Sequence, residues 1–344
     1  MTVSQALKSV TGGATLSSEE AELVLSDIVD GSPSQLQVAA LLGALRARGE
    51  SPAELVGFAR ALRCRVIPVV ASSSPLVDTC GTGGDSPSTG LGTFNISTAA
   101  SLIACAAGAK IAKHGNRAVS SRSGSADVLE ALGVHLDLSP EAIARSIDEV
   151  GIGFMFAPAH HPAMKSVASI RRELGIRTVF NLLGPLANPA NASRQVMGVP
   201  AHKWLRPIAE TLLELGCEYA FVVHSEDGLD EFSTCAITHY IELRDGQLHE
   251  HTFHPHHNDI HCMNPSYLSG GDANENAEII EQILNGSEGP SADIACLNAA
   301  AVLQVAGIVP NWAEGLKLAR AATSSGAARE TLRLLRDFTS QFAR

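Results

Sequence analysis

Three glycines and two aspartates crowd a short segment after an apolar run, Asp78-Thr79-Cys80-Gly81-Thr82-Gly83-Gly84-Asp85. Glycine lets the backbone approach a ligand closely, and consecutive N–H groups in such a loop can bind phosphate oxygens. The stretch Asn95-Ile96-Ser97-Thr98 then opens an expected helix, whose N-terminus also favours anions. A tight turn between strand and helix is the alternative for the glycines alone. The two segments together predict a phosphate site, although the loop matches neither Walker A nor GxGxxG.

A second polar segment, KHGNRAVSS, runs from Lys113 to Ser121 and is followed by Gly124 and Ser125. It combines two cations, an amide, an imidazole and several hydroxyls after a strand-like stretch. Such a density of donors suits a phosphate or a carboxylate. A solvated basic loop is the alternative on composition alone.

A third segment carries His160 and His161 and continues into a predicted helix that ends near Gly175. Its apolar stripe consists of Ala163, Val167, Ile170 and Leu174. At about 100° per residue, Arg171 lies on the flank of this stripe and Arg172 nearly opposite it. Arg171 can therefore reach into a cleft, unless it is an arginine at the edge of the core whose stem is buried and whose head is solvated.

Two adjacent carboxylates, Asp230 and Glu231, follow the apolar stretch that contains VVHS. Like charges side by side favour a bound cation, and oxygen ligands near a phosphate loop indicate Mg²⁺. A solvated acidic turn is the alternative. The stretch 249–261 holds six of the thirteen histidines, and we interpret it as a variable surface hairpin rather than a transition-metal site.

The order of expected elements indicates an α/β fold. Residues 1–66 predict about four short helices, with N-caps at Ser17, Ser32 and Ser51. From residue 67, strand-like runs that begin with VIPVV and PLVD alternate with helices, which predicts a mostly parallel sheet. Asp245-Gly246 predicts the turn of a β-hairpin.

Composition narrows the function classes. With 344 residues and 45% hydrophobic content, the chain can bury a large core, which excludes disorder as its main state. The net charge of -11 disfavours bulk nucleic acid and anionic membrane as partners. No apolar run is long enough to span a membrane. Seven scattered cysteines without a CxxC pair predict a reduced, cytoplasmic protein.

These motifs together resemble the anthranilate phosphoribosyltransferase family. The resemblance rests on GTGGD, NIST, KHGNRAVSS, FAPxxHPAMK, IRRELGIRTVFNLLGPLANPA, GLDE and GGDANENA, in this order. It extends from LSSEEA near residue 16 to LNAAAVL near residue 298. It implies a class III phosphoribosyltransferase fold (nucleoside phosphorylase type II-like). A small all-helical subdomain, 1–66 with helices around 162–190, would join a large α/β subdomain, 67–344. Ten positions separate Asp85 from Asn95, which exceeds the usual spacing of the family.

The resemblance also implies an activity, namely transfer of the phosphoribosyl group of 5-phosphoribosyl-1-pyrophosphate (PRPP) to the amine of anthranilate in tryptophan biosynthesis. We expect Lys113, Asn116 and Arg171 to be catalytic, with Mg²⁺ bound by Ser97, Asp230 and Glu231. The expected PRPP ligands are Gly81, Gly84, Asp85, Thr93, Asn95, Ser97, Thr98, Lys113, Ser121 and Ser125. The expected anthranilate ligands are Gly81, His114, Asn116, His161 and Arg171. A homodimer through the helical subdomain is also implied.

Two other readings stay open at this point. A nucleoside phosphorylase of the same fold would use phosphate and a nucleobase, but Arg171 and the KHGNR segment argue against it. A non-catalytic paralogue that binds nucleic acid is disfavoured by the acidic charge and by the Asp230-Glu231 pair. Phosphorolysis of thymidine or uridine would indicate the first, and retention on single-stranded DNA without PRPP binding would indicate the second.

Overall fold

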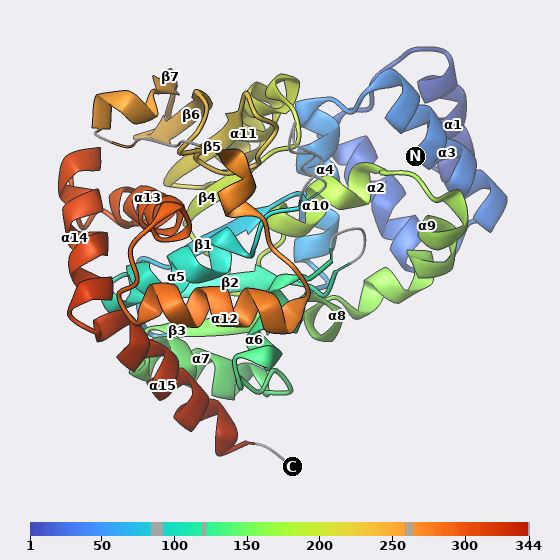
Figure 1. The fold of residues 1–344 in the computed structure, drawn as a ribbon. Coiled ribbons are helices and arrows are strands. Elements are labelled where there is room, and N and C mark those ends of the chain that lie inside the picture. The colour runs from blue at the N-terminus through green and yellow to red at the C-terminus, as the bar shows by residue number, and fades with distance from the viewer. Residues whose placement is uncertain (84–91, 119–121, 259, 261–263, 343–344) are drawn as a thin grey trace.

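The computed structural model describes residues 1–83, 92–118, 122–258, 260 and 264–342. A group of N-terminal helices stands beside a large sheet that is covered by helices on both faces (Figure 1). The chain therefore has the predicted α/β architecture, with an added helical part. The described residues contain no helix that is long and apolar enough to cross a membrane.

The N-terminal helices begin where the sequence predicts, with one exception. They are α1 (Val3–Thr11), α2 (Ser18–Val29), α3 (Gln35–Arg48) and α4 (Pro52–Arg63). Ser17 and Ser51 form capping boxes with Glu20 and Glu54, as expected. The N-cap of α3 is Ser34 and not Ser32, because the Ser34 hydroxyl accepts from the backbone N–H of Gln37.

One seven-stranded sheet forms the centre, in the order β3-β2-β1-β4-β5-β6-β7. The first five strands run parallel, whereas β6 and β7 are antiparallel to their neighbours. The strands are β1 (Val77–Gly81), β2 (Ile111–Gly115), β3 (Ile152–Phe156), β4 (Arg194–Gly198), β5 (Tyr219–Ser225), β6 (Thr238–Arg244) and β7 (Gln247–Phe253). Asp245 and Gly246 form the turn between β6 and β7 with φ of 51° and 73°, as their sequence predicts.

The strand expected at VIPVV is wrong, since residues 66–70 form no strand. Ile67 donates its N–H to the carbonyl of His160, and Val69 donates to that of Pro189. Pro68 between them has no N–H, so this segment cannot supply the regular donors of a central strand. It instead ties the N-terminal helices to the end of α8 (Ala157–His160) and to the loop at Pro189.

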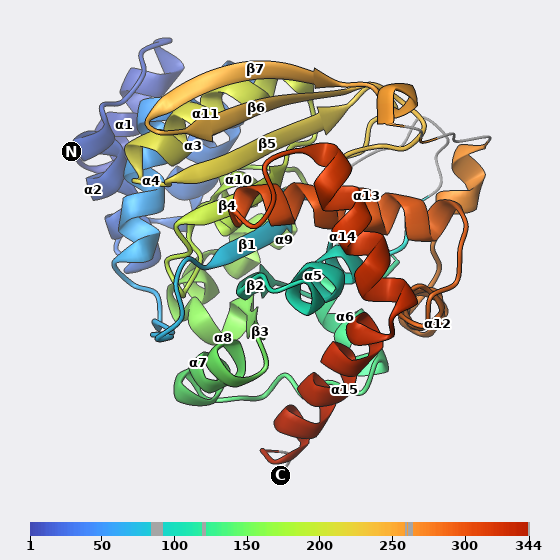
Figure 2. The same cartoon turned by 90° about the vertical axis from the view of Figure 1, so that its left-hand side faces the viewer.

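Helices cover the two faces of the sheet with separate cores (Figure 2). One core joins the sheet to α5 (Ile96–Ala106), α6 (Ser125–Ala131), α12 (Ala273–Leu284), α13 (Pro290–Val305), α14 (Trp312–Ser324) and α15 (Ala327–Ser340). The other joins it to the N-terminal helices, α9 (Ala168–Leu174), α10 (Val179–Leu186) and α11 (Leu205–Glu214). A smaller cluster packs α7 (Pro140–Glu149) on β2 and β3.

Short helical segments complete the chain. They are α8 (Ala157–His160) and the 3-10 turns η1 (Pro162–Val167), η2 (His202–Trp204), η3 (Pro255–Asn258) and η4 (Pro265–Leu268). The helix expected from residue 162 thus begins as the 3-10 turn η1 and becomes α-helical only at Ala168.

The cysteines only partly follow the expectation. Those at 64, 80, 105, 217 and 296 are free thiols, whereas Cys235 is disulfide-bonded. The prediction of a wholly reduced set is therefore wrong at Cys235.

Candidate active site

The strand order creates a crevice at the carboxyl ends of β1 and β4. The chain winds from β1 to β2 and β3 on one side, and β4 then returns to the other side of β1. Ligands of open α/β sheets bind at such a switch point. Gly81 ends β1 and Gly198 ends β4, and a Cβ at either position would collide with Asp230. The two glycines therefore allow the Asp230 loop to close over these strand ends.

Lys113 lies at the floor of this crevice and is only 2% exposed. Its Nζ is 2.5 Å from the carbonyl oxygen of Thr79, 3.1 Å from the Thr79 hydroxyl and 3.3 Å from the Ser97 hydroxyl. Burial lowers the pKa of Lys113, whereas the nearby charges of Asp78 and Glu231 act in the opposite direction. All three contacts of Nζ are to oxygens that can accept its hydrogens, so they orient the ammonium group toward β1 and α5.

Asp78 supports this floor, although its motif gave no reason to assign it a role. The residue is 0% exposed, and its Oδ1 accepts the backbone N–H of His114 at 3.1 Å. Burial raises the pKa of Asp78, while hydrogen bonds from Asn188 and His114 oppose this shift. The carboxyl group therefore links β1 to β2 directly below Lys113 and His114.

Asp230 and Glu231 reach the same crevice. They line a cavity with Thr79, Gly81 and Ser97. The backbone N–H of Ser97 donates to Glu231 Oε1 at 3.2 Å. Asn298 on α13 fixes the adjoining backbone, because its side chain accepts from the N–H of Phe232 and donates to the Phe232 carbonyl. The structure thus brings the three expected metal-binding residues, Ser97, Asp230 and Glu231, around one cavity.

Asn95 and Thr93 contact the segment that contains GGDANENA. Asn95 Nδ2 donates to the Ser123 carbonyl at 3.2 Å, and Asn95 Oδ1 accepts from Asn276 Nδ2 at 2.9 Å. Thr93 pairs with Ser269 in an isolated β-bridge. The Asn95 side chain therefore joins the loop at Ser123 to the first turns of α12, and Asn276 is a residue that the sequence analysis did not single out. The neighbouring Thr98 is buried, and its Oγ1 has no hydrogen-bond partner within the described residues.

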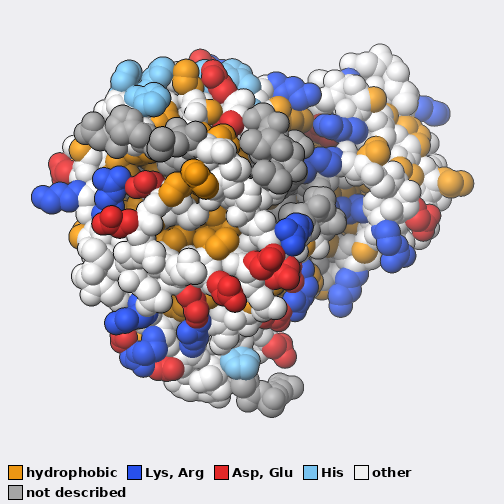
Figure 3. Space-filling view, in the orientation of Figure 1, with side chains coloured by type: hydrophobic (Ala, Val, Ile, Leu, Met, Phe, Trp, Pro, Cys, Tyr) orange, Lys and Arg blue, Asp and Glu red, His pale blue; other side chains and the backbone are white. Residues whose placement is uncertain are grey.

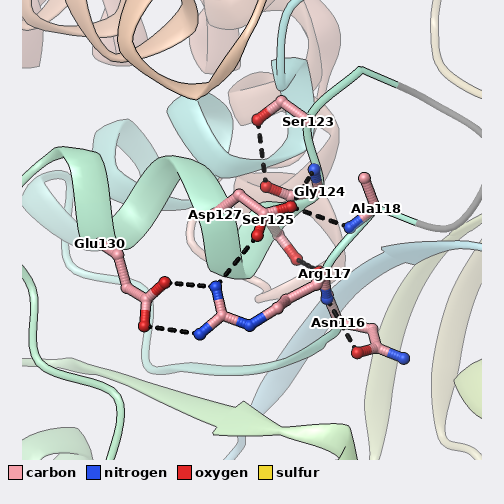
Figure 4. A network of polar contacts seen from close by, with 8 residues as sticks. All are labelled: Asn116, Arg117, Ala118, Ser123, Gly124, Ser125, Asp127 and Glu130. Atoms are coloured by element: carbon pink, nitrogen blue, oxygen red, sulfur yellow. Dashed lines mark hydrogen bonds and ion pairs between the residues drawn. The ribbon is translucent and has the colours of Figure 1, made fainter.

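Figure 4 shows how the basic loop after β2 is held. Arg117 forms ion pairs with Asp127, at 3.1 Å, and with Glu130, and its guanidinium lies 5.5 Å from the Phe156 ring centroid. Asp127 Oδ2 also accepts the backbone N–H groups of Ala118 and Gly124, both at 2.9 Å. The charge of Arg117 is thus neutralised by Asp127 and Glu130. Asp127 also joins Ala118 to Gly124, on the two sides of the loop segment that lies outside the described residues.

Two predicted residues lie on this loop. Asn116 is exposed, and its Oδ1 accepts the backbone N–H of Arg117 at 2.8 Å. The Ser125 hydroxyl is 3.4 Å from the carbonyl oxygen of Asn116, and a Cβ on Gly115 would collide with that hydroxyl. The loop therefore presents Asn116 and Ser125 next to each other at the end of β2.

The two arginines of α9 differ in burial, as their positions on the helix predict. Arg171 is half-buried and its guanidinium carbon lies 5.5 Å from the ring centroid of Phe180, whereas Arg172 is exposed. Burial lowers the pKa of Arg171. Within the described residues, no carboxylate pairs with Arg171. An arginine that is stacked on an aromatic ring and lacks an anion can bind a carboxylate.

The expected anthranilate residues His114 and His161 also lie together, with ring centroids 5.0 Å apart. Arg177, which the sequence analysis did not single out, donates from Nη2 to the Thr82 carbonyl at 2.9 Å and so joins the segment before α10 to the glycine loop. Gly84, Asp85 and Ser121 lie outside the described residues, as does most of the long spacing before Asn95.

The histidine-rich stretch lies away from this crevice. Figure 3 shows histidine side chains gathered over the hairpin of β6 and β7. His251 contacts Glu242 at 3.0 Å and stacks on Tyr240. In the part of the chain that the structure describes, no group of three or more His, Cys, Asp or Glu side chains could hold a metal ion.

Comparisons with known proteins identify the family and the fold. Residues 4–65 match the model of the glycosyl transferase family, helical bundle domain, and residues 73–329 match that of the glycosyl transferase family, a/b domain. The anthranilate phosphoribosyltransferase of Clostridium kluyveri is 48% identical over 326 residues, which cover 95% of this chain and 96% of that relative.

Two solved structures share the fold over nearly their whole length. The crystal structure of the Thermus thermophilus anthranilate phosphoribosyltransferase has a TM-score of 0.91 at 43% identity, covering 97% of this chain and 99% of that one. The Saccharomyces cerevisiae enzyme in complex with PRPP and Mg has a TM-score of 0.88 at 26% identity, covering 98% of both chains.

Proposed function

The chain belongs to the anthranilate phosphoribosyltransferase family, and on this premise we propose how its residues perform the reaction. The enzyme transfers the phosphoribosyl group of PRPP to the amine of anthranilate, with release of pyrophosphate, in tryptophan biosynthesis. The observation that carries the assignment of roles is the cavity lined by Gly81, Asp230 and Glu231. The buried Lys113 contacts two other residues that line it, Thr79 and Ser97.

Lys113 would stabilise the leaving pyrophosphate. Breaking the anomeric C–O bond places negative charge on pyrophosphate and positive charge on the ribose ring, so catalysis is mainly electrostatic and positional. The fixed contacts of Lys113 with Thr79 and Ser97 hold its charge near Gly81 and the N-terminus of α5. The remaining expected PRPP ligands stay predictions, including Gly84, Asp85 and Ser121.

Ser97, Asp230 and Glu231 would hold Mg²⁺. Their donor atoms are all oxygens, two carboxylates line one cavity, and the ion prefers such ligands together with phosphate oxygens. The donor set therefore fits the ion. Bound Mg²⁺ would supply positive charge to the pyrophosphate. The protein residues would orient that charge, because Asn298 and Ser97 fix the loop that carries both carboxylates.

Arg171 would bind the carboxylate of anthranilate, and Asn116 would add hydrogen bonds. The support is that Arg171 is half-buried on Phe180, whereas Asp127 and Glu130 occupy Arg117. Gly81, His114 and His161 would line the same site. Two anionic substrates repel each other, so these positive groups must compensate their charge when both are bound.

A second copy of the chain is the proposed partner, joined through the helical subdomain of residues 1–66. Leu36 on α3 is 84% exposed and Leu23 on α2 is 54% exposed. Exposed leucines on two helices of this subdomain are apolar surface that a second copy could cover. Sedimentation should show a dimer that Leu36→Glu weakens, whereas Leu334→Glu on α15 should not. A wild-type monomer at micromolar concentration would contradict the proposal.

The loss of anthranilate fluorescence in the presence of PRPP tests the residue assignments. In Arg171→Ala, the KM for anthranilate should rise about 10- to 100-fold while the KM for PRPP stays unchanged, because one charged hydrogen-bond partner is removed. Arg172→Ala is the matched control and should behave as wild type. An unchanged anthranilate KM in Arg171→Ala would remove Arg171 from the site.

The metal assignment needs its own pair of variants. Asp230→Asn combined with Glu231→Gln should abolish Mg²⁺-dependent turnover. Glu226→Gln is the control, because it neutralises an exposed carboxylate just upstream of the same loop. If the double variant titrates with Mg²⁺ as wild type does, these carboxylates do not bind the ion.

A further inference from the structure

Two buried histidine rings face each other beside the basic loop. His114 lies near the end of β2, and His161 joins α8 to η1. The two residues are 6% and 8% exposed, and their rings are inclined at 48°. In each ring Nε2 is buried and has no hydrogen-bond partner among the residues that the structure describes. Since a buried polar atom without a partner destabilises the fold, two of them together require an explanation.

The opposite side of each ring identifies the tautomer. A backbone hydrogen bond to Gly184 raises the pKa of His114, and one to Ala187 raises the pKa of His161. A backbone group that raises the pKa of an imidazole is an acceptor, so it faces a ring N–H. Because Nε2 is unpartnered, we assign the N–H to Nδ1 in both rings. Each Nε2 then carries a lone pair.

Both rings stay neutral at neutral pH. Burial and repulsion from His161 lower the pKa of His114 to about 3, and His160 and Lys113 add to this effect. Burial and repulsion from His160 lower the pKa of His161 to about 4. The pair therefore offers two acceptors, and no positive charge, to whatever lies against it.

Helix α10 connects this pair to Arg171. Arg171 stacks on Phe180, and Gly184 beside His114 follows one helical turn later, about 6 Å along the axis. A Cβ built on Gly184 would meet no atom within 4 Å. Open space therefore lies beside Gly184, one turn of α10 from the phenylalanine on which Arg171 stacks.

We propose that His114 and His161 together accept the hydrogens of the anthranilate amine, and that one of them takes a proton during the transfer. A primary aromatic amine has two N–H bonds, which matches the two Nε2 lone pairs. This assignment rests on the proposed binding of anthranilate at Arg171. The sequence analysis expected His114 and His161 only to line the site. The proposal assigns them a catalytic role.

The step balances in atoms and charge. The amine lone pair forms the bond to the anomeric carbon, and the C–O bond to pyrophosphate breaks with its electron pair on pyrophosphate. The nitrogen then carries a positive charge and two hydrogens, and one proton passes to Nε2. An N-alkylated aromatic ammonium is a much stronger acid than an alkylammonium, because the nitrogen lone pair is delocalised into the ring once the proton has left, so a weakly basic imidazole can accept its proton. The imidazolium then passes its proton to solvent when the products leave.

Steady-state kinetics of His114→Gln combined with His161→Gln test this role. Glutamine keeps a hydrogen-bond acceptor but cannot take the proton. We expect kcat to fall about 100-fold, the usual effect of losing a general base, while both KM values stay within about threefold of wild type. Each single variant should lose less, because the other ring remains. Thermal unfolding establishes that every variant is folded.

His160→Gln is the matched control, since His160 is equally buried but its Nδ1 already contacts the Ile67 carbonyl at 2.9 Å. Its kcat should stay near wild type. If the double variant does not fold, a wild-type solvent isotope effect on single-turnover product formation replaces it, and a value of one would overturn the proposal. A higher anthranilate KM with unchanged kcat would also overturn it. Absence of product from the wild type would instead contradict the proposed function.

Discussion

The ends of β1 and β2 differ from the hairpin of β6 and β7 in how they treat titratable side chains. At the crevice, Lys113, Asp78 and His114 are almost completely buried, and each has specific contacts. By contrast, His249 on β7 is exposed, as are His256 and His257 in the turn η3 that follows the hairpin. The hairpin and the turn after it are richer in metal-binding residue types, but in neither region do the described residues contain a group of three or more His, Cys, Asp or Glu side chains that could hold a metal ion. We therefore predict that burial and fixed partners, rather than the number of ligand-type residues, indicate the functional site.

The largest expected loss of activity follows from replacing Lys113, and a lysine at the other end of the same strand provides the comparison. Lys113→Met should lower kcat/KM by about 10³-fold, because it removes a fixed positive charge from the leaving group. Lys110→Met is the control, since Lys110 precedes β2 and contacts the carbonyls of Ile147 and Asp148. Fluorescence-detected turnover measures both. Equal losses in the two variants would mean that Lys113 acts only through folding.

A smaller effect is expected at Asn276, which contacts the crevice only through Asn95. Asn276→Ala removes the partner of Asn95 Oδ1 and an acceptor for the backbone N–H of Gly271. The KM for PRPP should rise about 10-fold, the scale of one or two lost hydrogen bonds. Asn274→Ala, on the exposed side of the same helical turn, should leave it unchanged. A normal PRPP KM in Asn276→Ala would limit its role to stability.

Local features of the fold could be predicted from sequence because they depend on neighbours in the chain. The caps Ser17 and Ser51, the turn Asp245-Gly246 and the contrast between Arg171 and Arg172 all follow from residue type and spacing. Each of these features is decided within a few residues. Local sequence is therefore sufficient to predict these features.

Other features could not be predicted because they depend on contacts between distant segments. Asn276 meets Asn95 across 181 positions, and Phe232 meets Asn298 across 66. The segment 66–70 has the composition of a strand, but Pro68 and two loop contacts determine its conformation. The pairing of His114 with His161 likewise requires the fold to bring β2 and η1 together.

The buried histidines His114 and His161 should make the free energy of unfolding depend on pH, with an effect of moderate size. The pKa values of about 3 for His114 and about 4 for His161 lie below the ordinary value of 6.5, so the unfolded chain binds protons that the folded chain does not. Their contribution to stability is complete above pH 6.5 and is lost progressively as the pH falls toward 4.

Urea unfolding at pH 7.5 and at pH 5 measures this contribution. The wild type should lose more stability between the two pH values than the double variant His114→Gln, His161→Gln, because carboxylates affect both proteins equally. If replacing the exposed histidines of β7 and η3 reduced the pH dependence of the free energy of unfolding by the same amount, the contrast between buried and exposed histidines would be wrong.

The smallest effect on activity is expected from the exposed histidines of β7 and η3. A triple variant, His249→Gln, His256→Gln and His257→Gln, should keep kcat/KM within about twofold of wild type, as is usual for exposed positions away from a site. His251 is left in place because it contacts Glu242 and stacks on Tyr240, so its loss would disturb β6. Turnover with Mg²⁺, before and after added Zn²⁺, measures the effect. A loss of activity in the triple variant, or a Zn²⁺ response that the triple variant removes, would show that the exposed histidines bind a functional metal and that burial is the wrong criterion here.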